Sequence, residues 1–440
     1  MDKRELTALA SQVLDYAKQA GATDAETELT LSHGLSLTVR MGELETVEHS
    51  RDRGMGITAY VGKRKGNATT GDLSPATLKE AAQKAVTLAK YAAEDPFSGL
   101  PEKSSLATHF PDLDLNHPWN ISAEAATLLA KECEDAAFAA DSRINNSDGG
   151  NVSTGHSGFI YANTHGFAAG YESTRHGISA SVLAEDAEGN MQTAYWYDSA
   201  RNQKDFMSVK EIGTLAGQRA AARLGARRLP TGKVPVIFEA QLASSLIGSF
   251  VSAVSGGSLY RKTSFLQDAL NTQVFPEWFE IEEDPFILRA LGSMPFDEEG
   301  VAPRKRKIIE RGVLKDYFLN TYSARKLGLV STGNAGGSTN LRCTVGAKSL
   351  TELMRDMGRG LLVTDLMGQG VNAITGDYSR GAAGFWIEGG EIAYPVEEIT
   401  IAGNLKEMYR GIAAVGSDVD RRGGKHIGSV LISEMAVAGE

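Results

Sequence analysis

The sequence contains few residues whose types and spacing could carry out catalysis. Ser323 and Lys326 match a Ser-x-x-Lys pattern, in which one helical turn aims the lysine at a serine nucleophile. Because two fixed positions often arise by chance, we keep this pair as an alternative hypothesis. The segment from Gly56 to Arg64 does not match a phosphate-binding loop. Five residues instead of four separate its glycines, and an arginine stands where the magnesium-binding hydroxyl is required.

Metal-ligating residues are equally sparse. The chain has eight histidines, but neither HExxH nor HExxxH occurs in it. His156, His165 and His176 fall in different expected strands or turns, where surface and turn roles are the expectation. Cys133 and Cys343 lie 210 positions apart without CxxC spacing, which argues against a cysteine zinc site and for a reducing compartment. We therefore expect a cytoplasmic protein that binds no cofactor of its own.

Composition narrows the class further. The chain has 440 residues, 42% of them hydrophobic, which is too long for one core and too apolar for disorder. Its first residues are charged and continue as an amphipathic helix, so we expect neither a targeting segment nor a membrane span. A formal charge of -10 repels a phosphate backbone. The basic run RKRK at 304–307 has acidic neighbours, and we interpret it as a solvated hairpin.

The order of expected elements repeats along the first half of the chain. A helix at 4–20, a strand meander with alternating apolar residues and a helix after Ser74 and Pro75 are followed by a proline-rich connector at 95–118. A second helix, meander and helix then follow. The pattern predicts an α+β fold with a duplicated N-terminal domain, residues 1–228, whose halves span about 1–95 and 119–228.

From residue 229 the composition changes. Glycine becomes frequent, short strands dominate, and two helices stand out, near 241–254 and 350–359. This pattern predicts a β-rich C-terminal domain, residues 229–440, that forms a barrel or a sandwich. The first of these helices follows the buried-looking strand VPVIF and carries no acid, base or metal ligand. Its apolar residues are expected to face the core: Leu246, Ile247, Phe250 and Val254.

Several long motifs resemble the TldD/PmbA family, once described as modulators of DNA gyrase and now regarded as peptidases. The glycine-rich segment DLMGQGVNAITGDYSRGAAGFWIEGGEIAYPVEEITIAGNLKEMY at 365–409 carries the resemblance. SGGSLYRKTSFL, ARKLGLVSTGNAGG and GSVLISEMAVAGE resemble its PmbA branch, also called TldE. The resemblance covers essentially the whole chain, and it implies that the duplicated domain and the β-rich domain are the fold of the family.

The resemblance also implies what the bare helix replaces. In the TldD subunit of the family, the corresponding helix carries HExxxH, whose histidines hold zinc and whose glutamate activates water, and a cysteine near the C-terminus completes the site. An ungapped pairing anchored on VPVIF and YRKTS places the histidine positions on Ile247 and Ser252, and the glutamate position on Gly248. These side chains cannot bind and activate a zinc ion. Since no cysteine follows Cys343, we expect no catalytic or metal-binding residues in this chain.

The family further implies a partner. The resemblance points to a TldD-like catalytic subunit that holds the zinc, and to unfolded peptides as substrates, in leader removal or antitoxin degradation. An extended peptide is most readily held by main-chain pairing with a strand edge. The candidate positions for binding peptide or partner lie in two segments, with ordinary turn roles as the alternative: Ser255, Gly256, Gly257, Tyr260 and Arg261, and Asn372, Thr375, Gly376, Asp377 and Arg380.

Three functional hypotheses follow. The first is a catalytically silent subunit of a zinc peptidase that acts as a heterodimer with its TldD-like partner. The second is a self-sufficient hydrolase that uses an unrecognised site such as Ser323 and Lys326. The third is a regulatory protein that binds gyrase or nucleic acid, against which the acidic charge argues. A surface shaped for a similar partner also permits a homodimer of the isolated chain.

Overall fold

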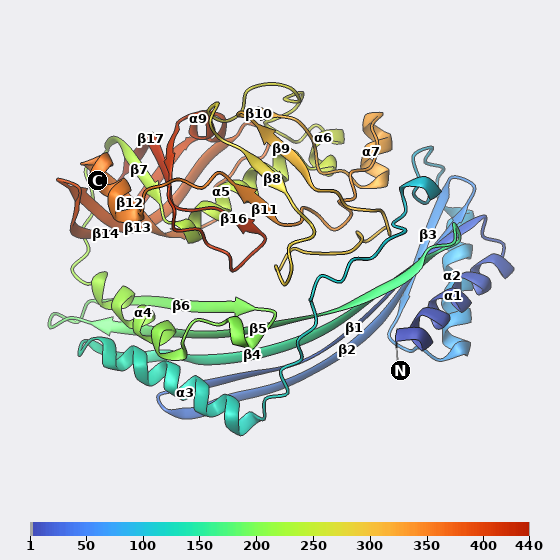
Figure 1. Cartoon of the computed structure of the whole chain (residues 1–440), viewed down its shortest axis with the longest axis horizontal. Helices are drawn as coiled ribbons and strands as arrows, with labels where there is room; N and C mark the ends of the chain where they lie inside the picture. Colours follow the sequence, from blue (N-terminus) through green and yellow to red (C-terminus); the bar gives the residue numbers. More distant parts are fainter. Residues whose placement is uncertain (1–2, 440) are drawn as a thin grey trace.

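The computed structural model describes residues 3–439. Its N-terminal part contains two successive units of helix, three antiparallel strands and helix (Figure 1). The first unit consists of α1 (Lys3–Gln19), β1 (Asp24–Arg40), β2 (Glu43–Val61), β3 (Arg64–Thr70) and α2 (Pro75–Tyr91). The second consists of α3 (Ala123–Ala140), β4 (Ile144–Asn163), β5 (Ala168–Glu185), β6 (Met191–Ala200) and α4 (Val209–Ala222).

The two units share one sheet. Its order is β3-β2-β1-β4-β5-β6, and β1 pairs antiparallel with β4 so that His33 lies opposite His156. Alternate residues of the strands pack beneath α1 and α2 in one half and beneath α3 and α4 in the other. The strands curve strongly, with the helices on the convex side and the C-terminal domain above the concave side (Figure 1).

The C-terminal domain is built around a closed barrel. Its strands are β7 (Gly232–Phe238), β12 (Gly360–Met367), β13 (Asp377–Glu388), β14 (Glu391–Asn404) and β17 (Val430–Ala438). They pair in the order β14-β13-β12-β7-β17, and β14 also pairs with β17, which closes the ring. β15 (Ile412–Val415) extends this sheet at β17. The predicted fold class, a duplicated α+β domain followed by a β-rich barrel, is confirmed.

A second sheet and several short helices complete this domain. The sheet has the order β10-β9-β8-β11-β16. Its strands are β8 (Ile281–Glu283), β9 (Arg306–Glu310), β10 (Val313–Leu314), β11 (Leu341–Cys343) and β16 (Lys425–His426). The helices are α5 (Ala240–Ala253), α6 (Gly256–Tyr260), α7 (Thr321–Leu327), α8 (Leu350–Met357) and α9 (Leu405–Arg410), and two short 3₁₀ turns cover Lys103–Ser105 and Gln203–Asp205.

Helix α5 follows β7 directly and is anchored in the main core of the C-terminal domain. The predicted core positions Leu246, Ile247, Phe250 and Val254 are all buried there, as expected. The hydroxyl of Tyr409 on α9 donates a hydrogen bond of 2.9 Å to the backbone oxygen of Leu246. Apolar burial therefore holds this helix in place.

The two domains are joined by aromatic and polar contacts. Tyr161, Phe167 and Phe296 form a buried cluster between the large sheet and the C-terminal domain, and Arg325 donates hydrogen bonds to backbone oxygens of Gly99 and Leu100 in the connector. Among the helices of residues 3–439, none combines the length and the hydrophobicity that crossing a bilayer requires.

Candidate functional site

A cavity of about 380 Å³ lies along α5. One wall is the face of α5 opposite its core residues, where Ser245, Gly248, Ser249 and Ser252 follow helical spacing. The facing wall is the hairpin between β12 and β13, and Ala253, Ser258 and Phe265 complete the lining. The cavity therefore combines segments that lie more than a hundred residues apart in the sequence.

Two residues of β13 give this cavity its polarity. Tyr378 and Arg380 are two positions apart, so their side chains lie on the same side of the strand, and both line the cavity. Tyr378 is only 2% exposed. Burial raises the pKa of Tyr378 to about 12, and the positive charge of Arg380 opposes that rise. The phenol therefore remains a hydrogen-bond donor at neutral pH.

These two side chains also carry unsatisfied polar atoms. Within residues 3–439, the buried hydroxyl of Tyr378 and the buried Nε of Arg380 have no hydrogen-bond partner. Nη2 of Arg380 reaches the backbone oxygen of Leu366 only at 3.5 Å. An unpaired buried polar group costs about 1–3 kcal/mol. The protein therefore leaves part of the hydrogen-bonding capacity of this wall unused.

The helix positions that the resemblance assigned to zinc ligation do not lie together. Ile247 is 1% exposed and packs in the core, whereas Gly248 and Ser252 line the cavity. If the HExxxH pattern is shifted by one residue, its first histidine position falls on Gly248, its glutamate position on Ser249 and its second histidine position on Ala253. All three of these residues line the cavity. Either register leaves the wall without an imidazole or a carboxylate.

The candidate segment at 255–262 forms a close helix contact beside this cavity. Gly256 is required there, because a Cβ on it would lie 2.2 Å from Oγ of Ser323 on α7. Ser255 precedes α6 as its N-cap residue, Gly257 lies against the guanidinium of Arg261, and that guanidinium stacks 5.3 Å from the ring centroid of Tyr260.

The residues of the candidate segment at 372–381 have two different roles in the structure. Asn372, Thr375 and Asp377 build the hairpin turn: Oδ1 of Asn372 accepts two backbone N–H groups, and the Thr375 hydroxyl donates to Asp377 at 2.6 Å. Gly376 has a φ of +83° and packs against Phe265. Of the five predicted positions in this segment, Arg380 lines the cavity. The cavity residues Tyr378, Ser245 and Ser249 were not predicted, although the serine spacing on one helix face was a readable signal.

The Ser-x-x-Lys pair on α7 has other partners. The hydroxyl of Ser323 is buried and donates to Oδ1 of Asn320 at 2.6 Å. Nζ of Lys326 lies 4.5 Å from the ring centroid of Phe97 and 3.9 Å from Asp95. A serine nucleophile needs a base within hydrogen-bond reach, and these contacts do not supply one.

Three of the four residues of the basic run are exposed, as expected of a solvated run, and Arg306 is the exception. Lys305 pairs with Asp284 at 3.0 Å. Arg306 is 10% exposed and pairs with the buried Glu283 at 2.9 Å. Cations that are held by acidic partners on the same sheet are poorly placed to bind a phosphate backbone.

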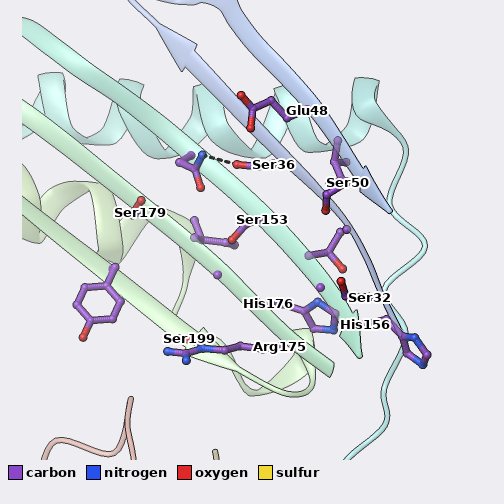
Figure 2. Close-up of a pocket in the computed structure, with 18 of the residues that line it drawn as sticks. Ser32, Ser36, Glu48, Ser50, Ser153, His156, Arg175, His176, Ser179 and Ser199 are labelled. Carbon is purple, nitrogen blue, oxygen red and sulfur yellow. Dashed lines mark hydrogen bonds between the residues drawn. The ribbon is translucent and has the colours of Figure 1, made fainter. Parts of the chain in front are cut away.

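A second, wider hollow of about 660 Å³ lies on the concave face of the large sheet. Figure 2 shows hydroxyl groups that project into it from neighbouring strands. Glycine at position 34 belongs to this face, and a Cβ there would lie 2.5 Å from the backbone oxygen of Thr154. Hydroxyl groups are frequent in the lining, alongside larger side chains such as His156, Arg175 and Tyr197. Its serines are Ser32, Ser36, Ser50, Ser153, Ser157, Ser179 and Ser199.

Comparisons with known proteins agree along the whole chain. Three family models match: PmbA/TldA metallopeptidase domain 1 over residues 25–89, the central domain over 116–224 and the C-terminal domain over 231–439. A protein named metalloprotease PmbA from Escherichia coli O157:H7 is 47% identical over 422 residues, which cover 96% of this chain and 94% of that protein.

Solved structures give the same result. A putative modulator of DNA gyrase from Bacteroides thetaiotaomicron superimposes with a TM-score of 0.94 at 29% identity and covers 100% of both chains. TldE from Thermococcus kodakarensis superimposes with a TM-score of 0.86 at 21% identity, over 98% of this chain and 100% of the other, and thus shares the fold. The resemblance found in the sequence is confirmed, and the chain belongs to the PmbA/TldA metallopeptidase family.

Proposed function

We propose that this chain is the TldE-like subunit of a zinc peptidase, in which a TldD-like subunit supplies the catalytic metal. The chain itself binds peptide and partner and performs no hydrolysis alone. The observation that carries the proposal is the donor set along α5, where serine hydroxyls, a phenol and a guanidinium line the cavity. The substrates are unfolded peptides, such as leader peptides or antitoxins.

The residues at this cavity do not fit a catalytic zinc ion. Zinc in hydrolases is held by three protein ligands from histidine, cysteine or carboxylate side chains. Throughout residues 3–439, no three such side chains are grouped closely enough to hold a metal ion. A guanidinium at the wall also repels a cation, so the electrostatics of the cavity favour an anionic or neutral group instead.

A partner of related fold supports the same proposal. We expect a TldD-like subunit of the same family to present a corresponding surface, since proteins of like shape commonly associate around a two-fold or pseudo-two-fold axis. The isolated chain can then form a homodimer through the surface that the partner uses. The free, buried thiols of Cys133 and Cys343 fit the reducing, cytoplasmic location that we propose.

The test is reconstitution. The chain is purified alone, the TldD-like subunit is purified alone, and both are combined and assayed for cleavage of an unstructured peptide and for bound zinc. We expect chelator-sensitive cleavage only in the mixture, with the zinc content following the TldD-like subunit. Robust, chelator-sensitive cleavage by the lone chain would reject the proposal.

Matched variants locate the catalytic machinery within the complex. Replacing the motif glutamate of the TldD-like subunit by glutamine should abolish cleavage, because it removes the base that activates water. Ser323→Ala in this chain should leave cleavage within about twofold, since the hydroxyl of Ser323 donates to Asn320 and has no base beside it. If the serine variant abolished cleavage in a folded complex, the silent-subunit proposal would be wrong.

A further inference from the structure

The α5 cavity has the charge and the hydrogen-bonding groups of an anion site. Arg380 is the charged residue of its wall, and the wall contains no aspartate or glutamate. Asp377, the nearest acid along β13, is held by Thr375 and by the side chain of Asn404. The positive charge of Arg380 is therefore not neutralised from within the cavity.

A second cation lies against the same helix. Cε of Lys425 on β16 is 3.6 Å from the place that a Cβ on Gly248 would occupy. This distance is an ordinary van der Waals contact, and Lys425 does not belong to the cavity lining. Arg380 is the cation at the wall, and in a partly enclosed setting its attraction for an anion is stronger than at an open surface.

The hydrogen-bonding groups at the wall have the corresponding polarity. The hydroxyl of Tyr378 and Nε of Arg380 have no partner at hydrogen-bond distance in residues 3–439, although the Arg380 side chain lies close enough to the phenol to oppose the rise in its pKa. A ligand that brings acceptor oxygens relieves these unsatisfied groups. A planar carboxylate suits a guanidinium especially well, because the two pair in a fork-like geometry.

The volume of the cavity and its apolar lining further restrict the class of ligand that it can bind. A volume of about 380 Å³ is at the lower end of sites that enclose small ligands. Apolar groups flank the charged wall, with Phe265 lining the cavity and Val371 of the hairpin partly exposed at it. A carboxylate attached to a short stretch of peptide therefore fits better than a bare inorganic anion.

We propose that this cavity binds the free carboxylate end of an extended peptide, with Arg380 as the ion partner and Tyr378 as a hydrogen-bond donor. The inference rests on the proposed function, because it assumes that peptides reach this subunit. It deepens that function by giving the lost catalytic helix a binding role. The chain would hold one end of the substrate while the partner cleaves it.

The experiment measures binding of a short unstructured peptide to the purified full chain by titration calorimetry. The peptide is used in two forms, with a free C-terminal carboxylate and with a C-terminal amide. We expect the free acid to bind at least about tenfold more tightly, since hydrogen bonds to charged groups are among the stronger ones. Equal binding of the two forms to the wild-type chain overturns the proposal.

Variants test the assigned residues. Arg380→Gln should remove the difference between acid and amide, and Tyr378→Phe should weaken binding of the acid several-fold. Arg311→Gln is the matched control, because this arginine pairs with Glu277 at an exposed turn outside the cavity wall. Full discrimination by a folded Arg380→Gln chain would overturn the assignment, and circular dichroism and thermal melts confirm folding.

Two further arms separate related outcomes. An amidated peptide with an internal glutamate tests whether any carboxylate suffices, and tighter binding of this peptide than of the free acid contradicts the terminal assignment. Competition by inorganic phosphate as strong as that by the free-acid peptide likewise contradicts it. If acid and amide bind equally but the reconstituted complex still cleaves peptide, the carboxylate site is wrong and the proposed function stands.

Discussion

Replacement of Phe250 by alanine tests whether α5 serves as a packed scaffold. The side chain is 0% exposed, and its ring lies edge-on to Phe275 with the centroids 5.3 Å apart. It also contacts the ring of Tyr409 at 6.2 Å. Truncation to alanine removes this buried ring and leaves a cavity that the surrounding barrel can only partly fill.

The expected cost is about 3–5 kcal/mol in the free energy of unfolding. For a domain of this size, each kcal/mol lowers the melting temperature by about 2–4 °C, so the C-terminal transition should fall by roughly 6–20 °C. Differential scanning calorimetry of the full chain measures this shift. Ser252→Ala, on the exposed side of the same helix, is the control and should stay within about 0.5 kcal/mol.

The result also separates a scaffold from a site. If α5 is a scaffold, the Phe250→Ala complex loses peptide cleavage only in proportion to the folded fraction that remains. A loss below about 1 kcal/mol for Phe250→Ala, or a larger loss for Ser252→Ala than for Phe250→Ala, would refute the reasoning. Either outcome would mean that the core contacts of this helix do not hold it in place.

Three further predictions follow from single residues. Gly256→Ala should destabilise the chain by about 1–3 kcal/mol in thermal melts, because the new Cβ would clash with Ser323; unchanged stability would contradict the close contact of α6 with α7. Burial raises the pKa of Asp297 to about 7. The contribution of this carboxyl group to stability is therefore present below about pH 4 and is lost as the pH rises towards 7, with a slope of at most about 1.4 kcal/mol per pH unit. Asp297→Asn should flatten this slope in a urea unfolding series, and an identical slope for the variant would contradict the prediction. Ser323→Ala and Lys326→Ala should leave cleavage by the reconstituted complex unchanged, and abolished cleavage by either folded variant would restore the hydrolase hypothesis.

Local sequence patterns predicted most of the individual elements. The expected helix after Ser74 and Pro75 begins at Pro75, and the expected helix near 241–254 is α5, at Ala240–Ala253. Helix formation depends on residues three and four positions apart, which are visible in a short window of sequence. The second strand meander was expected to begin only at residue 158, so the start of β4 was not predicted. Its first residues, INNSDGGNVSTGHS, contain the glycines and polar residues of turns. Pairing with β1 keeps them extended.

In the candidate site too, the sequence predicted local properties but not contacts between distant segments. The sequence indicated that α5 lacks metal ligands, since that conclusion needs only residue types. It also singled out Arg380, but as one of five polar or glycine positions in a hairpin. It could not indicate that Tyr378 and Arg380 would face the serines of α5, because no local signal connects these segments.

By itself, the sequence determined the duplicated order of helices and strands, the family and the absence of a zinc-binding motif. These properties follow from residue types and from periodicities of two and 3.6 residues, which are local. Only the tertiary structure decided that the two units share one sheet through β1 and β4, that β14 meets β17 to close the barrel, and that Arg380 lies in a cavity beside α5. Such contacts between distant segments are set by the packing of the whole chain, because a strand edge or a helix face can pair with several partners until burial selects one.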